Sequence, residues 1–262
     1  MLVDTHTHLN FQEFEKDLDQ VIKRAIKNKV EKIVCVSSNL QESEKAIEIA
    51  QKYPGIVFAA IGIHPHQTDP KTKLSTKEQL QKLAKLTKRK EVVVIGECGL
   101  DYSPAPPGEK DRSQKEQLFL FKKQIELALK EKLPINIHSR KASSETLEIL
   151  ERYGKKGLKG IWHCYSAGKK RIKRISQLGF FFGVDGNLTY DPGFQNVFSQ
   201  IPLEEIVLET DCPFLTPEPY RGQRSEPSHV KITAEYLAKL KDTTLEEVAK
   251  ITTQNVKKIF KI

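Results

Sequence analysis

The sequence predicts an α/β fold, a (β/α)8 barrel with additional C-terminal helices. Three observations support this prediction: short β-branched runs recur along the chain, segments with helical apolar spacing separate them, and the strand–helix alternation repeats eight times. Continuous apolar runs, without apolar–polar alternation, are typical of parallel strands buried on both faces. Eight such strands can close into a barrel, whereas an open doubly wound sheet more often has about five or six.

The predicted strands are eight short runs rich in valine, isoleucine and phenylalanine. In chain order they cover residues 2–3, 32–36, 56–61, 92–95, 135–137, 160–162, 180–184 and 206–208. Between them, apolar residues recur at the spacing of a helix face. The clearest of these helical segments are 18–25, 46–50, 80–84, 118–129 and 147–150.

After the last predicted strand, residues 226–262 are expected to add two helices to the barrel. The second helix is opened by the capping-box pattern of Thr244 and Glu247. Two proline-rich loops, residues 103–108 and 213–227, follow predicted strand ends. A barrel carries its site at those ends, so both loops are expected to wall the pocket.

Composition places the chain among globular proteins. Its 262 residues are 38% hydrophobic, which suffices for a sizeable core and excludes a disordered chain, and residues 1–262 are expected to form a single domain. A net charge of +9 would attract a polyanion such as DNA. Lysines interleave with glutamates along the predicted helices, however, so a solvated surface is the simpler explanation of this charge.

The start of the chain predicts a cytoplasmic protein. Asp4 stands where a signal peptide needs a basic and then an apolar run, and the most apolar stretch, residues 56–63, is far shorter than the ~20 residues of a membrane span. Four cysteines without a C-x-x-C pair suit reduced thiols. No wide apolar stripe is evident, so we expect a monomer without a membrane partner.

Uncommon polar residues gather at the carboxyl ends of the predicted strands, where barrel enzymes carry their catalytic groups. Six of the seven histidines follow this rule: His6, His8, His64, His66, His138 and His163. Carboxylates follow the fourth and eighth predicted strands, at Glu97, Asp101, Glu209 and Asp211. In a barrel these ends converge, so the side chains are expected to share one mouth.

The alternation of side chains along a strand explains why two of these pairs could act together. His6 and His8 are two residues apart on an extended segment, so both imidazoles point the same way and can bind one cation. Glu209 and Asp211 have the same spacing, and two such carboxylates repel each other unless a cation or a proton lies between them. The alternative for Asp211 is a helix N-cap or a turn.

The number of possible ligands predicts two divalent cations, of Mg, Mn or Zn. One tetrahedral zinc would leave several of the six best candidates unused, whereas two cations bridged by a carboxylate would use them all. These candidates are His6, His8, Glu97, His138, His163 and Asp211. We expect Glu97 to bridge the cations and Asp211 to act as the general base towards water.

Seven motifs in this chain resemble the TatD family of metal-dependent hydrolases and deoxyribonucleases, which belongs to the amidohydrolase-like TIM barrels. They occur in the family's order and span about residues 1 to 230. The motifs are VDTHTHL (3–9), GIHPH (62–66), VIGECGLDY (94–102), INIHSR (135–140), WHCYS (162–166), VLETDCPFL (207–215) and YRGQRSEP (220–227).

The resemblance implies a ligand set for each cation and a substrate site. The implied ligands of the first cation are His6, His8, Glu97 and Asp211. Those of the second cation are Glu97, His138 and His163. The residues implied to line the phosphate or substrate site are His64, Glu209 and Arg221.

The chain departs from the family pattern at three positions, none of them a proposed ligand. Ser225 replaces the usual asparagine, which puts a loop-fixing or substrate hydrogen bond in doubt. Lys141 stands where an acidic residue is common, and Ala167 where glycine is frequent.

Cys98, Cys164 and Cys212 each directly follow a predicted site residue. Neighbouring residues of a strand point to opposite faces, so these thiols are expected to face away from the cations and to pack as small apolar side chains. A thiolate ligand or nucleophile is the alternative.

The ligand set, the positive charge and the resemblance together predict a deoxyribonuclease, a 3′–5′ exonuclease that cleaves phosphodiester bonds in a DNA substrate. One alternative keeps the same site but hydrolyses an ester or amide, such as the aminoacyl ester of a mischarged tRNA. The other is a nucleic-acid-binding protein with a vestigial metal site.

Overall fold

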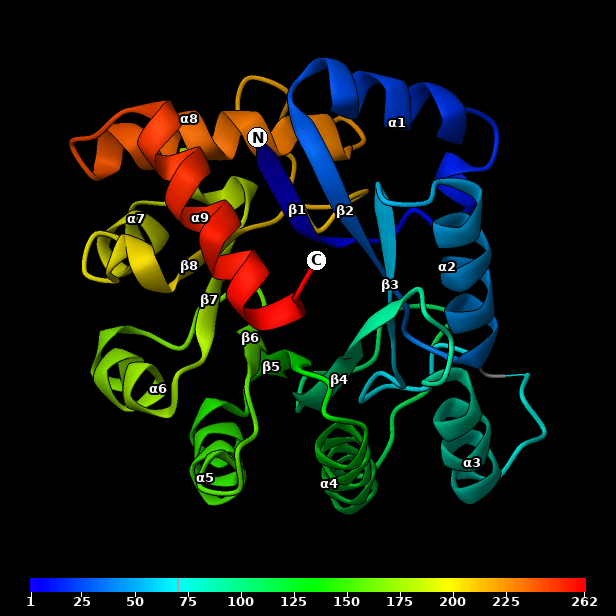
Figure 1. Ribbon diagram of the computed structural model, residues 1–262. Coiled ribbons are helices and arrows are strands. Elements are labelled where there is room, and N and C mark those ends of the chain that lie inside the picture. The colour runs from blue at the N-terminus through cyan, green and yellow to red at the C-terminus, as the bar shows by residue number, and fades with distance from the viewer. Residues whose placement is uncertain (70) are drawn as a thin grey trace.

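The computed structural model describes residues 1–69 and 71–262, and it confirms the predicted (β/α)8 barrel. Eight parallel strands pair in chain order, each with the next, and helices surround them (Figure 1). The strands are β1 (Leu2–Thr7), β2 (Val30–Val36), β3 (Val57–Ile61), β4 (Val92–Asp101), β5 (Ile135–Arg140), β6 (Gly160–Trp162), β7 (Phe181–Val184) and β8 (Ile206–Leu208).

The helices include all of the predicted segments and two short ones, α6 and α7, that the apolar spacing did not predict. They are α1 (Leu18–Lys27), α2 (Leu40–Lys52), α3 (Thr76–Leu86), α4 (Gln114–Glu131), α5 (Ser143–Gly154), α6 (Ile172–Leu178), α7 (Pro192–Phe198), α8 (Val230–Leu240) and α9 (Leu245–Phe260). In the described part of the chain, no helix combines the length and the apolar character that crossing a membrane requires.

The predicted cap of the last helix is confirmed. The backbone N–H of Glu247 donates to the Thr244 hydroxyl at 3.2 Å, which caps α9 as the capping-box pattern predicts. This helix lies across one end of the barrel, and the C-terminus lies near the barrel axis (Figure 1).

Two apolar clusters hold the barrel together. The larger cluster fills the ring between the outer faces of the strands and the helices. The smaller one is made of inward-facing strand residues such as Val34, Val94 and Val207, joined by Ile259 and Phe260 of α9. The last helix therefore plugs the amino-terminal end of the barrel, and the opposite end is left to polar side chains.

The barrel closes between its first and last strands. Thr7 and Cys212 form a parallel bridge, and the N–H of Asp211 donates to the carbonyl of His6 at 2.9 Å. The N–H of His8 donates to the carbonyl of Cys212 at 2.8 Å. These backbone bonds fix three predicted ligands, His6, His8 and Asp211, relative to one another.

Candidate metal centre

A cleft of about 220 Å³ opens at the carboxyl ends of the strands, where the predicted site was expected. Pro106 and Phe214 contribute to its wall, so both proline-rich loops line the pocket as predicted. The lining residues are His8, Phe11, Ser38, His64, His66, Thr68, Glu97, Asp101, Pro106, Glu109, His138, Arg140, His163, Asp211 and Phe214.

Four possible ligand atoms converge at the bottom of this cleft. Nε2 of His6 lies 3.2 Å from Nε2 of His8 and 3.6 Å from both Oε2 of Glu97 and Oδ1 of Asp211. Nε2 of His8 lies 3.9 Å from the same oxygen of Glu97 and 3.3 Å from that of Asp211. The atoms of this first group come from β1 and the residue that follows it, from β4 and from the turn after β8.

These spacings fit a divalent cation. Ligand atoms about 2.1 Å from a tetrahedral metal lie about 3.4 Å from one another, and the five distances of the first group range from 3.2 to 3.9 Å. Two imidazoles and two carboxylates also match the chemistry of zinc and manganese ligands. The residues expected to hold the first cation are therefore brought together.

Glu97 faces two groups with its two oxygens. Oε2 belongs to the first group, whereas Oε1 lies 2.7 Å from Nδ1 of His138. The other nitrogen of His138, Nε2, lies 2.9 Å from Oδ2 of Asp101. This is the arrangement that a bridging carboxylate needs, with a second ligand on its far side and a buried carboxylate behind that ligand.

Neighbouring groups orient the imidazoles of His8 and His163 in the same way. Nδ1 of His8 lies 3.2 Å from the carbonyl oxygen of Val36, so Nε2 is turned to the first group. Nδ1 of His163 lies 2.9 Å from Oε1 of Glu209, while its Nε2 lies 3.8 Å from Oδ1 of Asp211. Such partners are typical of metal-binding histidines, because they fix the tautomer and the ring orientation.

His163 lies beside the first group. Its ring stacks on that of His6, with centroids 3.6 Å apart. Its contact with Asp211 also belongs to this side of Glu97, away from His138. The assignment of His163 to the second cation stays a prediction.

The carboxylates of the centre raise the pKa of two of its histidines. Burial lowers the pKa of His138, but the carboxylates of Asp101 and Glu97 outweigh it and raise the pKa to about 9. Burial also lowers the pKa of His163, and Glu209 and Asp211 raise it to about 10. The carboxylates of this pocket therefore demand positive charge, which divalent cations would supply in exchange for protons.

His64 is a neutral hydrogen-bond donor on the cleft wall. Burial and the neighbouring His138 lower its pKa to about 3. Its Nδ1 accepts a hydrogen bond from the N–H of His66 at 3.2 Å, so the proton of the neutral ring is on Nε2. An Nε2–H group in the pocket can donate to a substrate oxygen.

Neither Glu209 nor Arg221 lines the cleft, unlike His64, although Glu209 lies close enough to His6 and His163 to form a possible metal-binding group with them. Glu209 is fully buried, and its Oε1 accepts a hydrogen bond from the N–H of Cys164 at 2.6 Å. A Cβ on Gly183 would come within 2.4 Å of its Oε2, so only glycine leaves room for this carboxylate. Arg221 is exposed and stacks over the ring of Tyr190 at 4.1 Å.

The parity argument for Glu209 and Asp211 is wrong. β8 ends at Leu208, and Asp211 adopts a left-handed conformation with φ of 55°. Asp211 opens a turn, because the N–H of Phe214 donates to its carbonyl at 2.9 Å. The two carboxylates consequently reach opposite nitrogens of His163 and do not point together.

Sequence reasoning missed several residues of the site, among them Asp4, Arg140 and Glu109. Asp4 is fully buried beneath it, where Oδ1 accepts from the N–H of Thr210 at 3.0 Å and joins β1 to the end of β8. Arg140 and Glu109 line the cleft itself. Arg140 is the last residue of the INIHSR motif, so the motif could have indicated it. Glu109 directly follows the loop 103–108, which was predicted only to wall the pocket.

The structure supports the apolar interpretation for Cys98 and Cys212, whereas Cys164 lies past the end of β6 with a φ of 45° and is partly exposed. All four are free, and Cys98 and Cys212 are fully buried. Burial raises the pKa of the Cys164 thiol well above its usual value, which disfavours a thiolate.

Ser225, which replaces the family's usual asparagine, still holds its loop. Its N–H donates to the carbonyl of Pro213 at 3.0 Å, and its hydroxyl lies 3.5 Å from Nδ1 of His229.

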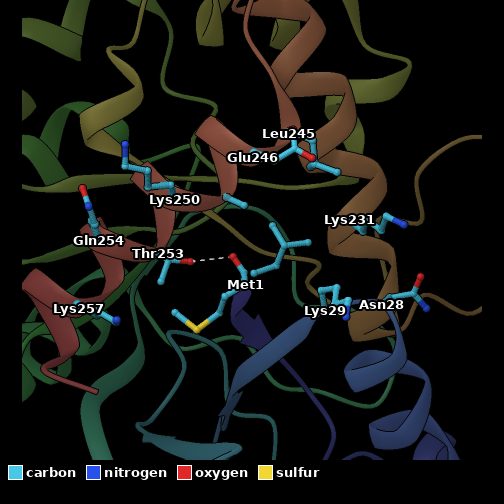
Figure 2. Close-up of a pocket in the computed structure, with 12 residues that line it drawn as sticks. Met1, Asn28, Lys29, Lys231, Leu245, Glu246, Lys250, Thr253, Gln254 and Lys257 are labelled. Carbon is cyan, nitrogen blue, oxygen red and sulfur yellow. Dashed lines mark hydrogen bonds between the residues drawn. The ribbon is translucent and has the colours of Figure 1, made fainter.

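A second cleft, of about 420 Å³, lies at the opposite end of the barrel beside α9 (Figure 2). Its floor is apolar, with Met1, Leu2 and Leu245, and Lys231 and Lys250 stand on its wall. None of its lining residues is a histidine or a cysteine. The chemistry of the chain is therefore concentrated at the carboxyl ends of the strands.

Comparison with known proteins agrees with this geometry. The family model described as TatD related DNase matches residues 3–261. The metal-dependent hydrolase YabD of Bacillus subtilis is 40% identical over 265 residues, covering all of both chains. Human deoxyribonuclease TATDN3 is 35% identical over 99% of this chain and 94% of its own.

A solved structure shows the same architecture. The crystal structure of YJJV, a TatD homologue from Escherichia coli K12, superimposes with a TM-score of 0.89 at 27% identity, over 100% of this chain and 98% of that one. With the barrel, the cluster of ligand atoms and a family match over nearly its whole length, this chain belongs to the TatD family of metal-dependent hydrolases.

Proposed function

We propose that the chain is a deoxyribonuclease that uses two divalent cations bridged by Glu97 and removes nucleotides in the 3′–5′ direction. The observation that carries this proposal is the arrangement of Glu97, whose two oxygens face two different sets of histidines. The name of the human relative, deoxyribonuclease TATDN3, supports DNA as the substrate.

The protein groups divide the chemical work among them. Divalent cations in such a site neutralise charge on a phosphodiester and lower the pKa of water. Burial raises the pKa of Asp211, but His163 and His8 outweigh it and lower the pKa, so the carboxylate is ionised and can accept a proton from the attacking water. His64 donates from Nε2 to a phosphoryl oxygen.

The cleft wall also suits a nucleic acid strand. Phe214 is 51% exposed beside the cleft, and Phe11 lies behind it with ring centroids 6.2 Å apart. An exposed aromatic ring can stack on a base, whatever the sequence. Arg140, exposed on the same cleft, supplies a positive charge for the phosphate backbone.

The test is hydrolysis of labelled single-stranded and duplex DNA by purified protein with Mg²⁺, Mn²⁺ or Zn²⁺. We expect products that shorten stepwise from the 3′ end, and labels at either end of the DNA report this direction. Protein that cuts no DNA with any of these cations, but hydrolyses an aminoacyl ester of tRNA, would contradict the proposal.

His138→Ala is expected to lower kcat by at least about 100-fold, because it removes the ligand on the far side of Glu97. Binding of DNA, measured in the presence of chelator, should stay largely intact. His229→Ala, which changes a histidine outside the cleft, is the matched control and should keep its turnover. Turnover by His138→Ala at the level of this control would argue against a centre that includes β5.

A further inference from the structure

Arg112 is a buried cation that makes no salt bridge within the described residues, although the more distant carboxylate of Glu116 favours its charged form. Arg112 is 9% exposed, and its Nε has no hydrogen-bond partner among the residues that the structure describes. The ion pairs found within this same part of the chain do not include it. Burying an unpaired charge is costly, so a guanidinium in this setting indicates that a ligand supplies its partner.

Arg112 lines a cleft of about 160 Å³ that adjoins the metal centre. Ser38 and Thr68 lie on the walls of both this cleft and the catalytic one, so the two clefts adjoin at these residues. The remaining wall comes from the loops after β2 and β3, from the start of α2, and from α3, which supplies Gln79 and Lys82. We call this space the Arg112 cleft.

Other groups of the Arg112 cleft also suit an anion. Thr68 Oγ1 accepts a hydrogen bond from Nδ2 of Asn39 at 2.9 Å, which leaves its own hydrogen free to donate. Lys82 stands on the wall as an exposed second cation.

Two carboxylates, Glu44 and Asp69, line the same cleft. Glu44 is exposed and Asp69 is partly exposed. Water screens both charges, whereas the buried guanidinium is screened much less. The group that most needs a partner is therefore the cation.

We propose that the Arg112 cleft binds a phosphate of the nucleic acid strand, next to the phosphate that is cut at the metal centre. This inference rests on the proposed function. The planar guanidinium presents several donors in a fixed fork, which matches the oxygens of a phosphate. A strand that enters the catalytic cleft past Ser38 and Thr68 would bring its neighbouring phosphate to Arg112.

Binding of a short fluorescein-labelled single-stranded DNA, measured by anisotropy in chelator, tests the cleft apart from catalysis. Arg112→Gln should weaken binding by about 10–100-fold, which is the effect of losing a charged hydrogen bond. It should also reduce the slope of log K against log salt by about 0.7, the value for one phosphate contact on a single strand. Arg112→Lys should keep the slope and lose part of the affinity.

Arg89→Gln is the matched control, because it removes an exposed arginine just before β4, at the opposite end of the barrel. It should leave both affinity and slope unchanged. Thermal unfolding gives a second readout: Arg112→Gln should be at least as stable as the parent, since a structural role would predict a loss of stability.

The outcomes separate this inference from the proposed function. If the parent cuts DNA with Mn²⁺ but Arg112→Gln binds with the parent's affinity and salt slope, the phosphate site is wrong and the nuclease stands. The site is also wrong if Arg112→Gln lowers the melting temperature clearly. If the parent neither binds nor cuts DNA, both proposals are overturned.

Discussion

Three of the histidines that face the metal centre are held by residues outside the group of ligands, whereas Nδ1 of His6 has no hydrogen-bond partner among the described residues. The carbonyl of Val36 orients His8, Glu209 orients His163 and Asp101 orients His138. One nitrogen of each of these three rings faces such a partner, so the other is presented in a fixed direction. At the scale of residues, the geometry of the centre depends as much on these partners as on the ligands.

Asp185, directly after β7, should make stability depend on pH. It is fully buried and its Oδ2 has no hydrogen-bond partner within the described ranges. Burial raises its pKa from 3.8 to about 7. A carboxyl whose folded pKa is raised contributes stability that is complete below the unfolded pKa and is lost as pH rises through the folded one.

Asp185→Asn should therefore gain stability over the parent as pH increases. The difference between the two melting temperatures is expected to grow by at least about 2–4 °C from about pH 5 to about pH 8, since each kcal/mol shifts the midpoint by that amount in a chain of this size. Thermal unfolding in chelator measures it. A difference that stays constant over this range would mean that Asp185 is already ionised at low pH.

At the scale of elements, the closing helix α9 joins the interior of the barrel. Ile259 and Phe260 pack with Val34, Val94 and Val207, which point inwards from their strands. The apolar residues of α9 thus complete the core at this end, where the strands alone would leave it open.

Phe260→Ala should destabilise the fold without affecting the metal centre. Truncating a buried phenylalanine costs about 3–5 kcal/mol, and Phe260 is 4% exposed. The melting temperature should fall by roughly 6–20 °C, while the metal content of the folded protein stays the same. Lys258→Ala, an exposed position of the same helix, is the control. Equal melting temperatures for the two variants would show that the packing of Phe260 against the barrel interior does not stabilise the fold.

Sequence patterns predicted every strand but not where the strands end. β1 continues to Thr7 and β4 to Asp101, beyond the apolar runs, because the polar ligands His6 and Glu97 are themselves strand residues. A search for apolar runs stops at such residues. α6 and α7, with seven residues each, are too short to show clear helical spacing.

The candidate site was predictable as a set of residues and less so as a geometry. Histidine positions at strand ends located the metal centre, since topology alone brings those ends together. The left-handed turn at Asp211 has no such signal, and neither has the burial of Glu209 behind His163. Arg112 was missed because nothing in sequence reveals that a cation lacks a partner.

At the scale of the whole molecule, the metal centre is a local concentration of carboxylates within a chain of net charge +9. A cation that binds only the folded protein stabilises it by about 2.7 kcal/mol at a concentration one hundred times its dissociation constant. Binding of Mn²⁺ or Zn²⁺ should then raise the melting temperature by about 5–11 °C.

Glu97→Gln should remove most of that shift, because it takes a charged ligand from both groups of the centre at once. Titration of the melting temperature with metal, for parent and variant, checks this. Equal shifts in both would show that the cations bind elsewhere. Metal analysis of protein purified without chelator identifies the native cation in the same samples.

The backbone bonds between β1 and the turn after β8 have a consequence for synthesis. His6 and Asp211 meet only when the first and the last strands are both in place. A nascent chain on the ribosome, or a fragment released early, can fold several strand–helix units and still lack the complete set of ligands. Hydrolytic activity would thus be withheld until the barrel is finished.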